Sequence, residues 1–172
     1  MRKHAGRPAA LAVPLLALAT ACSNPIDAPK AICGTPVDRD ALTPLLPEEG
    51  EVTQSSKQLT LDEYCVVRVD KSRVLQIEIR ELNEPLPAED WIPDKELGYL
   101  SGKVTQLPFA RRAIVGEQGA LVETDCGNPS KYLLFRVDYS PVDGQSEATS
   151  KKVKGFIQDY VTAAKKQVGC TA

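Results

Sequence analysis

Between residues 59 and 80, apolar and polar side chains alternate along the chain with a period of two. In the first segment, six alternate positions share one side of the chain: Leu59, Leu61, Glu63, Cys65, Val67 and Val69. In the second segment, Leu75, Ile77 and Ile79 alternate with polar side chains at 76, 78 and 80. A period of two is that of a strand with one buried and one solvated face. The pattern therefore predicts a β-hairpin that turns near Lys71 and Ser72.

Four further segments have strand-like patterns. They cover residues 103–107, 111–115, 120–126 and 133–139. Glycine-containing segments at 116–119 and 127–130 separate the last three of them and predict turns. Together with the hairpin, these segments predict a sheet of five or six antiparallel strands.

The clearest helical pattern lies at the carboxyl end of the chain. Apolar residues recur there at helical spacing over four turns, at Val153, Phe156, Ile157, Tyr160, Val161, Ala164 and Val168. Gly169 follows, and glycine is common just after the last turn of a helix. The predicted fold class is α+β, in which an antiparallel β-sheet is packed against this C-terminal amphipathic helix.

A short helix is also expected near Thr35. Thr35 is a suitable N-cap, Pro36 suits the first helical position, and Asp38 stands at the third. Pro44 and Pro47 are expected to end this helix, because proline lacks the N–H group that a helix interior needs.

The amino end differs in composition from the rest of the chain. Basic residues at 2, 3 and 7 precede an apolar run from Pro8 to Ala19. This run is too short to cross a bilayer, which takes roughly 20 apolar residues, and it is typical of a signal peptide. Thr20-Ala21-Cys22 then resembles the bacterial lipobox, although Ala19 stands where that motif usually has leucine. The resemblance implies that the Cys22 thiol is acylated, so the protein should incorporate labelled palmitate.

This interpretation divides the chain into three parts. Residues 1–21 are expected to be a lipoprotein signal peptide, 22–32 a membrane tether, and 33–172 a single extracytoplasmic domain. Lipid-anchored Cys22 would hold that domain on the outer face of the cell membrane. Ordinary secretory cleavage after Ala21 is the alternative, and it also exports the domain.

Loss of the signal peptide changes the chemistry of what remains. Residues 1–21 contain three of the 21 basic residues and none of the 23 acidic ones, so the net charge becomes about −5. An acidic domain of this kind is not expected to bind nucleic acid. The chain's only histidine, His4, is lost as well. The remaining chain therefore has no imidazole for a Ser-His-Asp triad or a His-ligated metal, and we expect neither metal nor cofactor.

Four cysteines remain in the expected domain: Cys33, Cys65, Cys126 and Cys170. An even number of cysteines in an oxidising compartment indicates disulfides. Of the three possible pairings we favour Cys33 with Cys65 and Cys126 with Cys170, because each ties the start of one half of the domain to a later element of that half. A metal site built from four thiolates, or a reactive thiol, is the alternative. The chain has no C-x-x-C motif to favour either.

In order along the chain, these elements resemble a known family. A short helix follows Cys33, a Val-rich hairpin follows Cys65, Gly119-Ala-Leu-Val-Glu-Thr-Asp-Cys126 precedes a strand, and a helix ends near Cys170. This arrangement over residues 33–170 is similar to that of small actinobacterial cell-envelope lipoproteins. The resemblance implies a helix on an antiparallel sheet with two disulfides, and it implies no catalytic residues.

Trp91 is the main candidate for a contact residue, since it stands in a loop rich in proline and acidic residues at 83–96. We favour Trp91 as an anchor that folds against the core, with ligand or partner contact as the alternative. The acidic residues around it lack the spacing of a calcium loop. Two strands also end in similar triplets, Arg68-Val-Asp70 and Arg136-Val-Asp138, through internal duplication or by chance.

These observations favour a non-enzymatic binding or interaction module of the cell envelope. Its partner would be an envelope protein, a glycan or a small solute. A hydrolase of envelope glycans that uses carboxylates alone is one alternative, and a structural accessory subunit of an envelope complex is another.

Overall fold

Seven strands form the main sheet of the computed structural model, which describes residues 25–58, 62–91, 105–128, 130–142 and 150–170. In sheet order they are β3 (Val52–Gln58), β4 (Asp62–Val69), β5 (Ser72–Leu82), β9 (Tyr132–Tyr139), β8 (Gly119–Asp125), β7 (Ala110–Val115) and β6 (Thr105–Leu107). All neighbouring strands are antiparallel. The β5–β9 pair joins three strands from the first half of the chain to four from the second.

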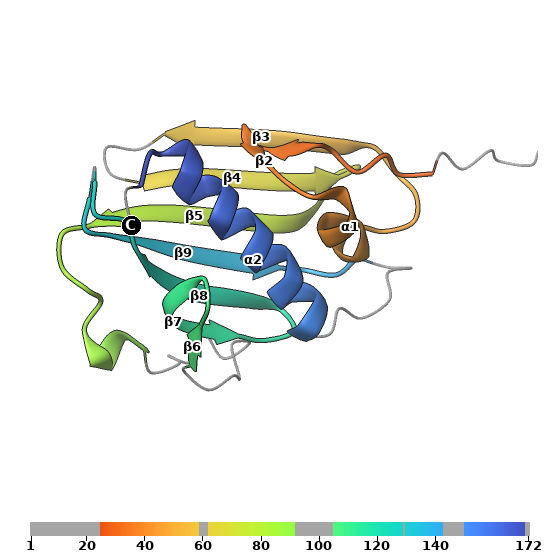
Figure 1. Ribbon diagram of the computed structural model, residues 1–172. Helices are drawn as coiled ribbons and strands as arrows, with labels where there is room; N and C mark the ends of the chain where they lie inside the picture. Colours follow the sequence, from red (N-terminus) through yellow and green to blue (C-terminus); the bar gives the residue numbers. More distant parts are fainter. Residues whose placement is uncertain (1–24, 59–61, 92–104, 129, 143–149, 171–172) are drawn as a thin grey trace, which may run out of the picture.

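Helix α2 (Ser150–Gln167) crosses one face of this sheet (Figure 1). Its buried side chains are Val153, Phe156, Ile157, Tyr160, Val161 and Ala164. They belong to one core cluster with inward-facing strand residues such as Ile77 and Phe135. Gly169 follows the helix with a φ of 78°, a conformation that glycine adopts without steric strain. The predicted α+β fold, with the C-terminal helix covering an antiparallel sheet, is confirmed.

Shorter elements extend the cover on the same side of the sheet. A two-stranded hairpin of β1 (Ala31–Ile32) and β2 (Thr35–Pro36) is followed by α1 (Arg39–Leu42) and the 3-10 helix η1 (Thr43–Leu45). Their apolar residues, including fully buried Ile32, Leu42 and Leu45, belong to the same core cluster as α2.

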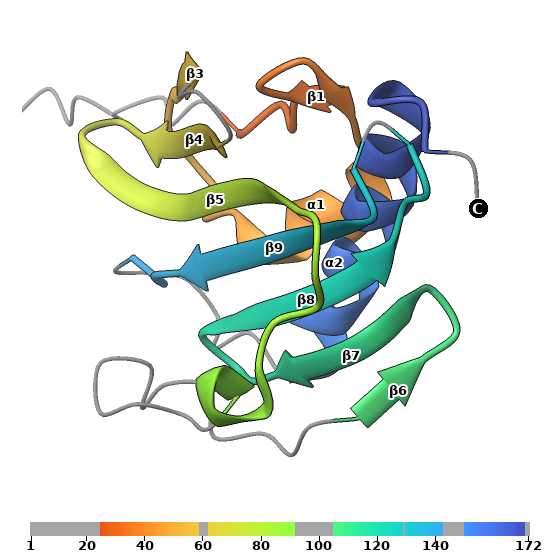
Figure 2. The same cartoon turned by 90° about the vertical axis from the view of Figure 1, so that its left-hand side faces the viewer.

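The opposite face of the sheet carries a second, smaller cluster. The 3-10 helix η2 (Ala88–Trp91) lies there beside the β7–β8 side of the sheet, away from α2 (Figure 2). The cluster consists of Trp91, Ile114, Leu121 and Leu134. Residues 83–91 form a strap that ends in η2. Beneath this strap, fully buried Glu123 pairs with Arg112 at 3.1 Å. On the β4–β5 side the same face presents mainly polar side chains, such as Gln76 and Glu78.

Two disulfides fasten the covering elements to the sheet. Cys33 is bonded to Cys65, which joins the β1–β2 hairpin to β4, and Cys126 is bonded to Cys170, which joins the end of β8 to the end of α2. The favoured pairing is confirmed, and the alternative of a four-thiolate metal site is wrong because the sulfurs are bonded in pairs. With sequence separations of 32 and 44, each bond restricts the unfolded chain enough to contribute about 4 kcal/mol.

The predicted helix start at Thr35 is wrong. Thr35 and Pro36 belong to β2, because the preceding Gly34, with a φ of 89°, turns the chain into a hairpin. The helix begins at Arg39, and its N-cap is Asp38, whose side chain accepts a hydrogen bond from the second helical N–H at 2.9 Å. The cap-and-proline pattern of Thr35 and Pro36 therefore lies about one turn before the actual start of the helix.

The predicted number of strands is also too small. Strand β3 was not expected, because the six residues from Thr53 to Gln58 are all exposed and show no apolar alternation. It is an edge strand held by seven paired positions with β4. The expected strand residues Leu59 and Leu61 lie outside the described residues.

Most of the expected tether belongs to the folded domain. Pro25 forms a β-bridge with Glu49, and the Ile26 N–H donates to the Glu48 carbonyl at 3.0 Å. Ile32 is fully buried. Of the segment 22–32, residues 22–24 lie outside the described residues, and the remainder packs against the domain.

Candidate functional site

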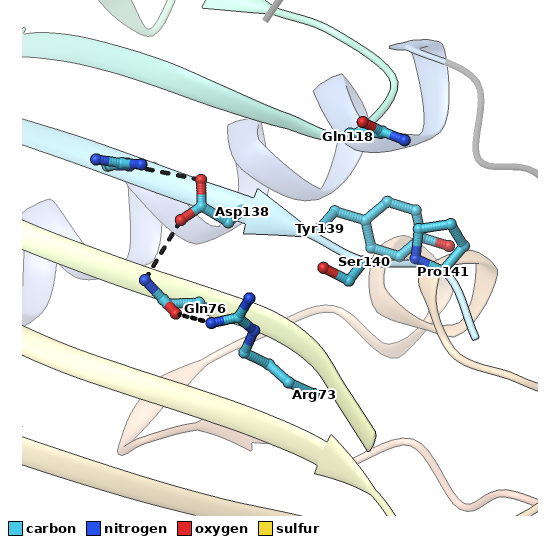
Figure 3. A pocket seen from close by; sticks show the side chains of 8 residues that line it. Arg73, Gln76, Gln118, Asp138, Tyr139, Ser140 and Pro141 are labelled. Atoms are coloured by element: carbon cyan, nitrogen blue, oxygen red, sulfur yellow. Dashed lines mark hydrogen bonds and ion pairs between the residues drawn. The ribbon is translucent and has the colours of Figure 1, made fainter. Parts of the chain in front are cut away.

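A hollow of about 580 Å³ opens where β5 and β9 meet the turn before β8 (Figure 3). Its polar lining consists of Arg73, Gln76, Gln118, Arg136, Asp138 and Ser140. Gln76, Arg136 and Asp138 alternate with core residues along their strands, so they face away from α2. This volume falls in the range of small-ligand sites, roughly 300–1,000 Å³.

A chain of hydrogen bonds orders the floor of the hollow. Gln76 and Asp138 are directly opposite each other on β5 and β9, and the Gln76 amide donates to the Asp138 carboxylate at 3.3 Å. The Arg73 guanidinium donates to the Gln76 carbonyl oxygen at 2.6 Å, as the dashed lines in Figure 3 show. Arg136 approaches the other oxygen of Asp138 at 3.5 Å. The central amide of Gln76 is thus fixed in orientation by a cation on one side and an anion on the other.

A pair of arginines lies on the β4–β5 side: Arg73 lines the hollow, and Arg68 on β4 is its neighbour outside the lining residues. The strand register shifts between Val67 and Arg68, which brings Arg68 directly opposite Arg73. Arg68 donates to the Ser55 hydroxyl at 3.3 Å, on the same side of the sheet as Val66 and Gln76. Like charges in directly opposite positions of a sheet are destabilising. Two positive charges therefore stand side by side here, and Asp138 is the carboxylate among the hollow's lining residues.

Tyr139 and Ser140 lie at the end of β9, at the edge of the hollow. The Tyr139 side chain is 3% exposed and belongs to the main core cluster. Burial raises the pKa of its phenol to about 12. The hydroxyl is buried and has no hydrogen-bond partner in the part of the chain that the structure describes. A buried hydroxyl in this condition is costly, since it has lost its bonds to water.

The residues that line the hollow are mainly hydrogen-bond donors and include few groups suited to acid–base or nucleophilic catalysis. Guanidinium and amide groups bind carboxylates, phosphates and hydroxyls through hydrogen bonds. Proton transfer with a nucleophile would require a base beside a hydroxyl or thiol, and glycoside hydrolysis would require two facing carboxylates. Of the residues that line the hollow, Asp138 alone carries a carboxylate, and it is already bonded to Gln76 and Arg136. The arrangement is suited to binding.

The candidate contact residue Trp91 and the candidate acylation site Cys22 are not among the residues that line the hollow. Trp91 is 3% exposed in the small cluster, where the Arg112 guanidinium lies over its ring at 4.7 Å. This position agrees with the favoured interpretation of a loop anchor, and its contact with a ligand or partner stays a prediction. Cys22 lies outside the described residues, as do Asp94 and Glu96 of the acidic loop.

Most of the hollow could not be found in the sequence. Gln76 and Gln118 read there as ordinary solvated positions of a strand and a turn. The repeated Arg-Val-Asp triplet was the available signal, because Arg68 and Arg136 come from it and stand on the two strands that flank β5. The sequence alone gave no register, so it could not show that Arg73 stands opposite Arg68.

No three His, Cys, Asp or Glu side chains in the described ranges are grouped so that they could hold a metal ion. No described helix is both long enough and apolar enough to span a membrane. Comparison with known proteins finds no family model, no curated protein and no solved structure that matches the chain.

Proposed function

We propose that this protein is a lipid-anchored, extracytoplasmic binding protein of the cell envelope, and that it holds a small polar ligand in the hollow without transforming it. The observation that carries the proposal is the ordered polar hollow at the junction of β5 and β9. A ligand there would meet side chains already fixed by hydrogen bonds, which lowers the entropy lost on binding.

The cysteines support the proposed location. Cys33, Cys65, Cys126 and Cys170 are joined in two disulfides, which persist mainly in oxidising compartments outside the cytoplasm. The fifth cysteine of the sequence is Cys22, at the proposed acylation position. An acyl group there would be three residues from Pro25, which is fixed to the domain by its bridge to Glu49. Three residues reach about 10 Å, so the domain would lie close to the membrane surface.

The chemistry of the hollow supports binding over catalysis. The proposed mature chain has no histidine, and the lining residues provide one carboxylate, Asp138. A carboxylate-dependent glycan hydrolase would need a second one across the site, at roughly 5–9.5 Å. None of the lining residues supplies it.

Metabolic labelling with a palmitate analogue tests the anchor. We expect the wild-type protein to be labelled and to fractionate with membranes, whereas Cys22→Ala should lose the label and be released. Ser23→Ala is the matched control and should retain the label. Equal labelling of wild type and Cys22→Ala would refute the proposed acylation site.

The detergent-solubilised full chain can then be tested for binding without turnover. We expect a fragment of an envelope glycan or a small polar solute to raise the melting temperature and to be recovered unchanged by mass spectrometry. A hydrolysed fragment would contradict the non-enzymatic assignment.

A further inference from the structure

Arg68 and Arg73 differ from every other arginine that the structure describes. Five of the seven described arginines have a carboxylate oxygen within 4 Å: Arg39, Arg80, Arg111, Arg112 and Arg136. In the described part of the chain, Arg68 and Arg73 have only neutral partners, the Ser55 hydroxyl and the Gln76 amide. The two arginines without a carboxylate are also the two that stand directly opposite each other.

The two arginines face each other because the pairing of β4 with β5 is irregular at this point. The irregularity at Val67 and Arg68 leaves Val74 as an extra residue on β5, fully buried in the core. Arg73 is thereby directed to the face that carries Gln76, to which it is bonded. Without the register shift, Arg68 would stand opposite Val74. Bulges of this kind are known to redirect side chains beside functional sites.

On this basis we propose that Arg68 and Arg73 form an oxyanion subsite that adjoins the hollow at Arg73 and binds the carboxylate or phosphate group of a polyhydroxylated ligand. The inference rests on the proposed binding function and specifies its ligand class. A guanidinium presents a planar fork of N–H donors that matches the geometry of both oxyanions. A bound oxyanion would also neutralise the two adjacent positive charges.

The other lining residues of the hollow limit which chemical groups the ligand can carry besides its oxyanion. Asp138 would repel a second anionic group at the β9 end, because it lies beside the hollow with its carboxylate oriented by Gln76 and Arg136. Gln118 and Ser140 add an amide and a hydroxyl to the lining. The ligand that fits is an acidic sugar or a similar polyol, with its single oxyanion toward the arginines and its hydroxyl groups toward Asp138.

Melting temperature of the full chain in detergent tests this proposal with three probes: glucuronate, glucose 6-phosphate and neutral glucose. At concentrations near 100 times the dissociation constant, an oxyanion probe should raise the melting temperature by about 5–10 °C, and added salt should reduce the shift. A response to glucuronate, to glucose 6-phosphate or to both supports the subsite and identifies the preferred anion. An equal response to glucose would overturn the oxyanion subsite and leave the proposed binding function standing.

The variant Arg68→Gln/Arg73→Gln should weaken oxyanion binding at least tenfold. Its own melting temperature should equal or exceed that of the wild type, because two like charges are removed, so loss of binding would not be mistaken for unfolding. Arg80→Gln is the matched control, since Arg80 lies on β5 but is paired with Asp62 at 3.4 Å, and it should bind as the wild type does. Undiminished binding by the double variant, or no response to either oxyanion, would overturn the proposal, while palmitate labelling tests the anchor independently.

Discussion

The buried ion pair beneath the η2 strap allows a quantitative prediction. Glu123 is fully buried, and both of its carboxylate oxygens lie 3.1–3.2 Å from the Arg112 guanidinium. One oxygen also accepts the Leu86 N–H at 2.6 Å, and Arg112 donates to the Leu86 carbonyl. The pair therefore binds both polar groups of one strap residue and joins residues 83–91 to β7 and β8.

Glu123→Gln removes the charge and keeps the shape of the side chain. Loss of one partner from a buried pair costs about 3–5 kcal/mol. Because the Arg112 side chain is 24% exposed and keeps some hydration, we expect the lower end, about 3 kcal/mol. For a domain of this size that loss lowers the melting temperature by about 6–12 °C.

A double-mutant cycle separates the pair from its surroundings. Arg112→Met/Glu123→Leu replaces both charges with apolar groups of similar volume. We expect it to lose less stability than Arg112→Met alone or Glu123→Leu alone, because no unpaired charge is left buried. Urea unfolding can be followed through Trp91, the only tryptophan, which lies under Arg112. Additive losses in the double variant would refute the reasoning that the pair acts as a unit.

Three further predictions concern the core and the disulfides. Cys126→Ala/Cys170→Ala should lower the free energy of unfolding by about 4 kcal/mol in urea titrations, and an unchanged midpoint would contradict the disulfide's role. Tyr139→Phe should leave the stability unchanged or raise it by up to about 1 kcal/mol, since it removes a buried hydroxyl without a described partner; a clear loss would show that the hydroxyl is bonded. Burial raises the pKa of Tyr160 to about 12 from 10.0, so the unfolded chain releases this proton first and stability should fall by about 2–3 kcal/mol between pH 10 and 12. Tyr160→Phe should lose that part of the pH dependence, and an identical profile would refute the assignment.

The sequence predicted the elements whose burial pattern is periodic. The apolar stripe of α2 and the alternation of β4 and β5 are visible because one face of each element is buried and the other is solvated. Strand β3 lacks this contrast, since it is an exposed edge strand whose pairing with β4 supplies its stability. The β1–β2 hairpin was missed because Thr35-Pro36 has the composition of a helix start.

The candidate site depends on relations between strands that a single sequence does not reveal. The number and positions of the cysteines were enough to predict the disulfides, and the size of Trp91 was enough to predict its burial. Arg73 and Gln118 come together with Arg136 only through the order and register of three strands. Glu123 likewise looks like a solvated residue within a strand, although it is fully buried beside Arg112.

Intact-mass spectrometry of the protein purified from membranes tests the proposed lipid anchor and the disulfides together. We expect a chain that begins at diacylglyceryl-modified Cys22 and carries no free thiol, with Cys33 joined to Cys65 and Cys126 joined to Cys170. A product that retains Met1, has unmodified Cys22 and is recovered with reduced cysteines would contradict it.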